Sequence, residues 1–343
     1  MQKKISIKDI ASQLGISITT VSFILNGKGK EKGISDVLTE KVLTHVQQTG
    51  YKPNQLAKSL RTGKTKIISL LIENISDPFF SSVAGYVEEI ANLRGYKIIY
   101  GSTKNETTKS RELINLFKDR HVDGFIITPA ENLEVDIINL QNEKIPFVLF
   151  DRYYKYVQTD YVGIDNFEST YNGVKHLIDQ GYKNIGFVTL DSDQTQMHDR
   201  LSGYIAALQN HSLPSFVLKV PYSKVDKIAT TEISIYIQKN KDLDALFFAT
   251  NYLALKGLDA LNELGLSVPV DLGLVAFDDH EIFKLYKPTI TAVTQPISAM
   301  SKQLVDLLLD QIDNQSETRQ FKHIIVPAIM NIRNSSTPQP SAN

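Results

Sequence analysis

The chain has 343 residues, of which 42% are hydrophobic, a formal net charge of −1 and no cysteine. This length and apolar content allow more than one folded domain and exclude a disordered chain, while the lack of cysteine excludes disulfides and thiolate metal sites. The sequence contains no apolar run of membrane-spanning length and opens on polar residues rather than on a signal peptide, so we expect a cytoplasmic protein.

The near-neutral total hides two regions of opposite charge. Residues 1–66 contain twelve lysines and arginines against four acidic residues, a net charge of +8, and the remaining residues carry −9. A basic segment on an acidic body is typical of a nucleic-acid-binding module joined to a larger domain. A solvated lysine-rich surface is the alternative, but it would not explain why the basic charge coincides with the helix pattern described next.

The first two dozen residues have the pattern of two short helices. Ser6 followed by Asp9 is a capping-box signature, apolar residues recur at helical spacing up to Leu14, and Gly15 should end the first helix. Ser17 is expected to cap the second helix. An ordinary helical hairpin has the same local pattern, and the basic charge favours a helix-turn-helix that enters a DNA groove.

The second helix should divide into a buried face and a DNA-facing side. Val21, Ile24 and Leu25 can share the buried face. The remaining side and the residues that follow it would then meet bases and phosphates. The candidate DNA contacts of this head are Ser17, Ile18, Thr19, Thr20, Ser22, Phe23, Asn26 and Lys28.

A third helix and a short linker complete the basic segment. Residues 34–49 should be helical, with Val37, Val42 and Val46 on the apolar stripe and Gly50 at the end. After Pro53, residues 55–60 have the pattern of one or two helical turns. So short a helix is not stable alone.

From Ile67 onward strands and helices alternate, which predicts an α/β body with parallel sheets. The order of elements also repeats. A strand at 67–72, a helix with Ala84-Gly85-Tyr86 and a strand at 122–128 are echoed by a strand at 185–190, a helix with Ser202-Gly203-Tyr204 and a strand at 243–250. Two similar subdomains are therefore expected, with a ligand cleft at the carboxyl ends of their strands.

Short motifs lie in a fixed order along nearly the whole chain. They are Ile7–Ala11, Thr20–Ser22, Leu25–Gly27, Tyr51–Asn54 with Ala57 and Leu60, Asp77–Phe80, Phe150–Arg152, Asp165–Asn166, Phe277–Asp279 and Gln295–Pro296. In this combination the chain resembles the lactose-repressor (LacI) family of bacterial transcription regulators. The resemblance implies a homodimeric, allosteric repressor with a DNA-binding head, a hinge helix and a periplasmic-binding-protein-like body that senses a small molecule.

The resemblance also implies a domain organisation. The helix-turn-helix head would span 1–52, the hinge helix and linker 53–66, the effector-binding body 67–337 and a tail 338–343. Three crossing strands would divide the body into subdomain 1 (67–163 and 294–323) and subdomain 2 (164–293 and 324–337). The expected fold is thus an all-α head on an α/β body of two doubly wound parallel-sheet subdomains.

The resemblance also implies DNA contacts in the linker, when its residues are matched position by position with those of the family. Leu60 corresponds to the hinge leucine that wedges into the minor groove, and Lys58 stands where the family often has arginine. A wedge between base steps kinks DNA at a cost that further contacts offset; packing of a short helix on the body is the alternative for Leu60. The DNA contacts expected in this segment are Tyr51, Asn54, Ala57, Lys58 and Leu60.

The head departs from the family at two places. Phe23 stands where the family usually presents a base-reading arginine, so contact with a thymine methyl or DNA shape must replace the bidentate contact to guanine. The stretch from Gly27 to Ile34 is longer than usual. Its lysines should contact phosphates, which adds affinity without sequence information.

Candidate effector-binding residues follow the expected strands of the body. By resemblance Asp151, Arg200, Asn251 and Asp278 bind the effector, with Arg200 opening a helix, while Tyr252 replaces the usual aspartate beside that asparagine. Position at strand ends adds Asp77, Phe79, Phe80 and Arg152.

Such carboxylates, guanidinium groups and an amide suit adjacent hydroxyls, and an aromatic ring suits a sugar face. Loop capping or ion pairing is the alternative for each polar residue, and one of the two phenylalanines is expected in the core. The tyrosines at 153, 154 and 156 could line the cleft or pack between the subdomains.

Other functions fit the sequence less well. The seven histidines show no paired metal-ligand spacing, no nucleophile elbow is present, and hydroxyl recognition is a simpler role for Asp151 and Asp278 than catalysis. A solute-binding protein for transport shares the body fold but would need export and no basic helix-turn-helix. We therefore expect no enzyme activity, cofactor, metal or membrane partner. The expected partners are operator double-stranded DNA at the nucleoid, a second copy of the chain, and a small polar effector, a sugar first and a purine second.

Overall fold

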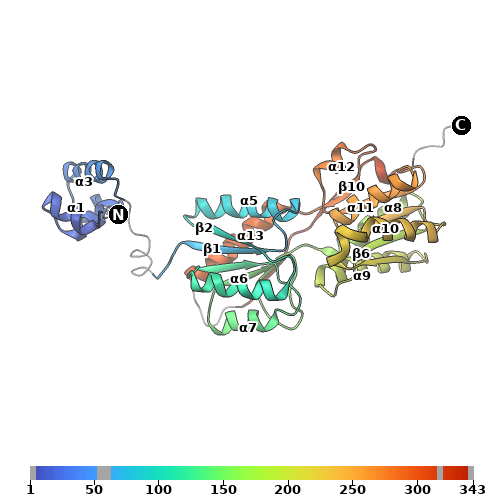
Figure 1. Cartoon of the computed structure of the whole chain (residues 1–343), viewed down its shortest axis with the longest axis horizontal. Helices are drawn as coiled ribbons and strands as arrows, with labels where there is room; N and C mark the ends of the chain where they lie inside the picture. Colours follow the sequence, from blue (N-terminus) through green and yellow to red (C-terminus); the bar gives the residue numbers. More distant parts are fainter. Residues whose placement is uncertain (1–4, 52–62, 315–319, 339–343) are drawn as a thin grey trace. The chain divides into compact units, whose positions relative to one another are not determined.

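The computed structural model describes residues 5–51, 63–314 and 320–338. Its contacts divide the chain into two units, residues 1–65 and residues 66–343, which are a small helical head and a larger α/β body (Figure 1). The predicted hinge helix, with the expected DNA contacts Asn54, Ala57, Lys58 and Leu60, lies outside the described residues. Within the described ranges no helix combines the length and the apolar character needed to cross a membrane.

The head is built from three helices whose ends follow the predicted caps. Ser6 and Asp9 form the capping box, Gly15 ends the first helix with φ 67°, and the Ser17 side chain caps the second. The buried core contains Ile10, Ala11, Val21, Ile24 and Val42. The elements are α1 (Ile7–Leu14), α2 (Ile18–Leu25), the 3-10 turn η1 (Lys30–Lys32) and α3 (Asp36–Thr49).

One prediction for the head core is wrong. Val37 was expected on the apolar stripe of α3, but it is 80% exposed. The helix begins at Asp36, and it turns Leu38 rather than Val37 towards the other helices. A one-residue error in the phase of a helix moves a side chain by about 100° around the axis.

The first subdomain of the body is a six-stranded parallel sheet in the order β11-β5-β4-β3-β1-β2. Helices α5 and α13 pack against each other on one face, and α6 and α7 contribute to the core on the other (Figure 1). The elements are β1 (Ile67–Ile72), α5 (Pro78–Leu93), β2 (Lys97–Ser102), α6 (Thr107–Asp119), β3 (Gly124–Ile127), α7 (Glu134–Asn142), β4 (Phe147–Phe150), β5 (Tyr161–Gly163), α13 (Ile297–Asp313) and β11 (His323–Ile325).

The second subdomain repeats this plan with the sheet order β12-β10-β9-β8-β6-β7. Helices α8 and α9 pack together, as do α10 and α11. The elements are α8 (Asn166–Asp179), β6 (Ile185–Leu190), α9 (Thr195–Asn210), β7 (Phe216–Val220), η2 (Tyr222–Lys224), α10 (Val225–Lys239), β8 (Ala245–Phe248), α11 (Asn251–Leu264), β9 (Gly273–Phe277), α12 (Glu281–Leu285), β10 (Thr291–Thr294), β12 (Ile329–Asn331) and η3 (Asn334–Ser336).

The chain passes between the two sheets three times, after β5, after β10 and between β11 and β12. The predicted helical head and α/β body with two sheets are confirmed. The edge strand β12 is the exception to the predicted parallel pairing, because it runs antiparallel to β10. Only three residues separate β11 in one sheet from β12 in the other.

Candidate functional site

The exposed side of α2 carries the predicted DNA contacts of the head. Ile18 is 43% exposed although it is apolar. Asn26 closes the helix by donating from Nδ2 to the carbonyl oxygen of Ser22 at 2.7 Å. Among the predicted contacts Ser17, Ile18, Thr19, Asn26 and Lys28 are exposed, and Thr20, Ser22, Phe23 and Tyr51 are half-buried.

The long connection after α2 is held against the head rather than extended from it. Gly29 is buried, and a Cβ at this position would lie 3.1 Å from Oγ1 of Thr39 on α3. The side chain of Lys30 is 88% exposed. Nζ of Lys32 lies 5.7 Å from the centroid of the Phe23 ring, a cation–π distance. The connection therefore places positive charge beside α2.

A pocket that is partly open to solvent lies between the two subdomains of the body. Seven of the eight predicted effector-binding residues line it; Arg152 does not. The lining residues are Glu73, Asp77, Phe79, Phe80, Asp151, Leu190, Gln194, Gln196, Met197, Arg200, Thr250, Asn251, Tyr252, Asp278 and Gln295.

Arg200 is the central cation of the pocket and is only 2% exposed. Its Nε donates to Oδ1 of Asn166 at 2.8 Å, and its Nη1 donates to the carbonyl oxygen of Ala249 at 2.7 Å. Nη1 also lies 3.4 Å from Oδ2 of Asp278, and the guanidinium carbon lies 3.6 Å from the centroid of the Phe277 ring. These contacts compensate a buried charge and fix its direction.

The local prediction for Arg200 needs a small correction. It does not open a helix, because α9 begins at Thr195, so that Arg200 lies in the second turn. A buried side chain inside a helix is positioned more rigidly than one on a loop.

Asp151 and Asp278 occupy equivalent positions in the two subdomains. Asp151 directly follows β4 and Asp278 directly follows β9. Both have left-handed backbone conformations, with φ 69° and φ 66°. Non-glycine residues in this region are uncommon, and such strain gathers at functional sites. Asp278 is held further by Gln295, whose Nε2 donates to its Oδ1 at 2.6 Å.

Two carboxyl groups of the pocket, those of Asp77 and Asp151, have raised pKa values. Burial is the main cause that raises the pKa of Asp77 to about 6, and the nearby Asp278 carboxylate raises it further. Burial likewise raises the pKa of Asp151 to about 6, against the opposing effect of Arg152 and Arg200. Asp77 also caps α5, because Oδ1 accepts from the backbone N–H of Phe79 at 2.8 Å.

These raised pKa values predict a pH-dependent stability. Because Asp77 holds its proton up to a pH of about 6 in the folded chain but only to about 3.8 in the unfolded chain, its contribution to stability is lost as the pH rises between these values. Asp77→Asn keeps the helix cap but cannot ionise. The Tm of the parent should therefore fall relative to that of Asp77→Asn between pH 4 and pH 7, measured without ligand. A constant difference between the two curves would show that this carboxylate ionises normally.

Arg152 lies beside the pocket and is not among the residues that line it. It is buried, and its Nη2 donates to Oε2 of Glu73, while its Nη1 lies 3.4 Å from Oδ1 of Asn105. The ion-pairing alternative describes its position. Sequence analysis missed Glu73, although it directly follows β1 as Asp151 follows β4.

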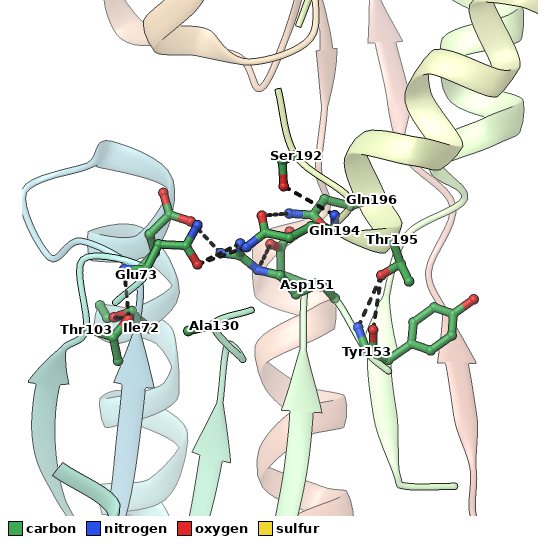
Figure 2. Close-up of polar contacts among 12 residues, drawn as sticks. Ile72, Glu73, Thr103, Ala130, Asp151, Tyr153, Ser192, Gln194, Thr195 and Gln196 are labelled. Carbon is green, nitrogen blue, oxygen red and sulfur yellow. Dashed lines mark hydrogen bonds and ion pairs between the residues drawn. The ribbon is translucent and has the colours of Figure 1, made fainter. Parts of the chain in front are cut away.

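Hydrogen bonds between residues in loops and at the start of α9 join the two subdomains beside the pocket. Nε2 of Gln194 donates to Oδ1 of Asn105 at 2.8 Å, and Oγ of Ser192 donates to Oε1 of Glu131 at 2.9 Å. The backbone N–H of Tyr153 donates to Oγ1 of Thr195 at 3.2 Å, as Figure 2 shows. No motif marks these residues, so sequence analysis did not find them.

The aromatic residues near the pocket belong mainly to the core. Phe79 and Phe80 are both buried and both line the pocket, so the expected division between core and cleft does not hold. Tyr153 and Tyr154 pack on the core of the first subdomain, and Tyr156 is exposed. Neither alternative left open for the three tyrosines describes these positions.

Comparisons with known proteins identify the domain type of the head and of the body. Residues 6–54 match the family model of bacterial regulatory proteins, lacI family, and residues 174–336 match that of the periplasmic binding protein-like domain. The HTH-type transcriptional repressor PurR of Haemophilus influenzae (strain PittEE) is 28% identical over 335 residues, which cover 96% of this chain and 98% of that protein. The chain therefore carries a LacI-family DNA-binding domain and a periplasmic binding protein-like domain.

Two solved structures of LacI-type proteins share the fold. The lac repressor dimer bound to operator and the anti-inducer ONPF has a TM-score of 0.85 at 19% identity, with 97% of this chain and 99% of that chain covered. A LacI family transcriptional regulator from Enterococcus faecium with bound ribose has a TM-score of 0.69 at 24% identity, with 80% and 100% covered. With both domains and a repressor as a relative over nearly its whole length, this chain is a DNA-binding transcription regulator that responds to a small molecule.

Phe23 is the position at which this LacI-family head should differ in sequence preference. A phenyl ring can contact a thymine methyl, whereas arginine pairs with guanine O6 and N7. We expect Phe23→Arg to shift the preference of the half-site towards guanine at one position, in operators selected from a random pool. Leu43→Arg is the control, because Leu43 is an exposed apolar residue of α3. It adds the same charge and should leave the consensus unchanged. An unchanged consensus for Phe23→Arg would assign Phe23 to packing alone.

Proposed function

We propose that this LacI-family protein is a repressor whose operator affinity is controlled by a sugar bound in the pocket between the subdomains. The observation that carries the proposal is the buried Arg200, directed by Asn166 and Ala249 and facing Asp278. Asp151 approaches from the other subdomain. Paired carboxylates beside a guanidinium can hold adjacent hydroxyls, and Phe79 and Phe80 offer an apolar wall for a sugar ring.

A purine is the second candidate for the effector. An arginine, an aspartate and the two phenylalanines of the wall could also hold and stack a base. Asp151 and Asp278 recognise the ligand in either case and do not catalyse a reaction. A repressor of this kind acts in the cytoplasm on operator DNA of the nucleoid, as a homodimer with two heads.

Thermal-shift screening of the intact chain against carbohydrates and nucleobases tests this proposal. A ligand that binds only the folded state raises the apparent Tm. We expect a sugar to produce the largest shift. If a nucleobase produces the largest shift, the effector is a purine rather than a sugar. If no member of the panel alters DNA binding, neither a sugar nor a purine controls the operator affinity.

The linker between the units is proposed to couple the pocket to DNA. Residues 55–60 are too few for a stable helix, so we expect them to fold when two protomers lie side by side on DNA, with Leu60 as the wedge. Closure of the pocket would change the spacing of the two hinges.

Leu60→Ala tests this coupling. The variant should bind a selected operator less tightly and bend it less, while the ligand affinity and the salt dependence stay unchanged, because no phosphate contact is lost. Band-shift affinity and bend angle are the quantities to measure. If Leu60→Ala has the same operator affinity and bend angle as the parent, the linker only tethers the head to the body.

A further inference from the structure

Two residues that line the pocket each have a buried side-chain carbonyl oxygen without a hydrogen-bond partner in the described part of the chain. Gln196 and Gln295 line the pocket and are each 5% exposed, and their Oε1 atoms accept no hydrogen bond from the described part of the chain. A buried acceptor without a partner is unfavourable, because it has lost its hydrogen bonds to water. A ligand that donates hydrogen bonds at these atoms would remove this cost.

The orientation of Gln295 follows from its neighbour. Its Nε2 donates to Oδ1 of Asp278 at 2.6 Å, so its Oε1 is left for the pocket. Exchanging the two atoms of the amide would bring Oε1 against a carboxylate oxygen, and both atoms would then be acceptors.

The orientation of Gln196 is set by a relay of hydrogen bonds that begins at a buried ion pair. Arg152, paired with Glu73, can only donate, so Asn105 turns Oδ1 towards it and also accepts there from Nε2 of Gln194. Oε1 of Gln194 then accepts from Nε2 of Gln196 at 3.3 Å, which leaves Oε1 of Gln196 for the pocket. Figure 2 shows contacts leading from Glu73 to Gln194 and Gln196.

The charged residues that line the pocket favour the same kind of ligand as these oxygens, namely one that donates hydrogen bonds and carries no negative charge. Glu73, Asp77, Asp151 and Asp278 all line it, but Arg200 is the sole basic residue among the described residues that do. The second guanidinium nearby, that of Arg152, is engaged by Glu73. The site is therefore rich in acceptors and poor in groups that could neutralise an anion, and an added phosphate or carboxylate would meet like charges in a buried space.

We infer that the pocket takes an uncharged, unphosphorylated polyol and rejects anionic derivatives of the same molecule, and that the relay from Arg152 to Gln196 fixes this preference. The inference rests on the proposed function and narrows it. Hydroxyl groups can donate to the amide oxygens and to the carboxylates, whereas phosphate and carboxylate groups are acceptors. Arg152 and Asn105 do not line the pocket and are positioning residues, because they act on it through Gln194 and Gln196.

Matched pairs of sugars test the preference. Thermal shifts of the intact protein would be measured with glucose, glucose 6-phosphate and gluconate, and with the corresponding sets for ribose, fructose and galactose. For the set that binds, the neutral sugar should bind at least about tenfold more tightly than its anionic form. A phosphorylated or acidic sugar that binds more tightly, through a shift that Arg200→Ala abolishes, overturns the inference and leaves the sugar proposal standing. A panel without any shift overturns both.

Two variants of Asn105 test the relay with whichever neutral sugar binds. Asn105 has φ 59°, which glycine and aspartate tolerate. Asn105→Asp keeps an acceptor for Arg152 and Gln194 and adds a negative charge, so the ratio of neutral to anionic affinity should be kept or raised. Asn105→Gly removes the acceptor, so the side-chain amides of Gln194 and Gln196 can rotate. The ratio of neutral to anionic affinity should then fall about fivefold or more. An unchanged ratio in Asn105→Gly would show that Arg152 and Asn105 have a structural role only.

Discussion

The intact protein should bind a selected operator with an affinity that falls steeply as salt increases, and the chain without residues 1–65 should not bind it. The head and the body are separate units, and the net charge of +8 lies within residues 1–66. Each phosphate contact releases counterions, so a protein with 6–10 such contacts loses roughly 10³–10⁵-fold in affinity between 50 and 200 mM salt.

A titration of duplex DNA at several salt concentrations measures this effect. The truncated chain should still show the ligand-induced thermal shift of the parent, which provides the control for its folding. Binding of the truncated chain to the operator, or a salt-independent affinity of the intact protein, would place the DNA contacts elsewhere.

Arg200→Ala and Asp278→Ala should each abolish the ligand-induced thermal shift and leave the operator affinity without ligand nearly unchanged. Each variant removes a charged hydrogen bond of roughly 1.5–3 kcal/mol, which corresponds to about tenfold or more in ligand affinity. The head that binds DNA does not contain these residues.

Arg333→Ala is the matched control for these two variants. Arg333 also pairs with an aspartate of the second subdomain, since its Nη1 lies 2.9 Å from Oδ1 of Asp279, but neither residue lines the pocket. This variant should lower the Tm and keep the ligand affinity. If Arg200→Ala and Asp278→Ala bind the ligand as tightly as the parent, both side chains have a structural role only.

Local signals in the sequence predicted the ends of the head helices. Ser6, Gly15 and Ser17 act through their own backbone or through residues three positions away, so a short stretch of sequence contains the whole interaction. The exposure of Val37 depends on the packing of three helices, and its spacing alone was misleading.

In the body, polar residues at strand ends predicted much of the pocket, because parallel strands bring their carboxyl ends to one edge. Arg152 shows where this reasoning fails. Its partner Glu73 is 79 residues away along the chain, and only the folded sheet makes the two neighbours. The relay through Asn105 and Gln194 joins two subdomains through loops, and no periodicity or spacing indicates it.

The most direct test of the account is the operator affinity of the intact protein with and without the sugar that gives the largest thermal shift, measured in the parent and in Arg200→Ala. Coupling between the pocket and DNA predicts that the sugar changes the operator affinity of the parent by about 5–150-fold and leaves that of Arg200→Ala unchanged. A sugar that stabilises the parent but does not alter its operator affinity would contradict the account.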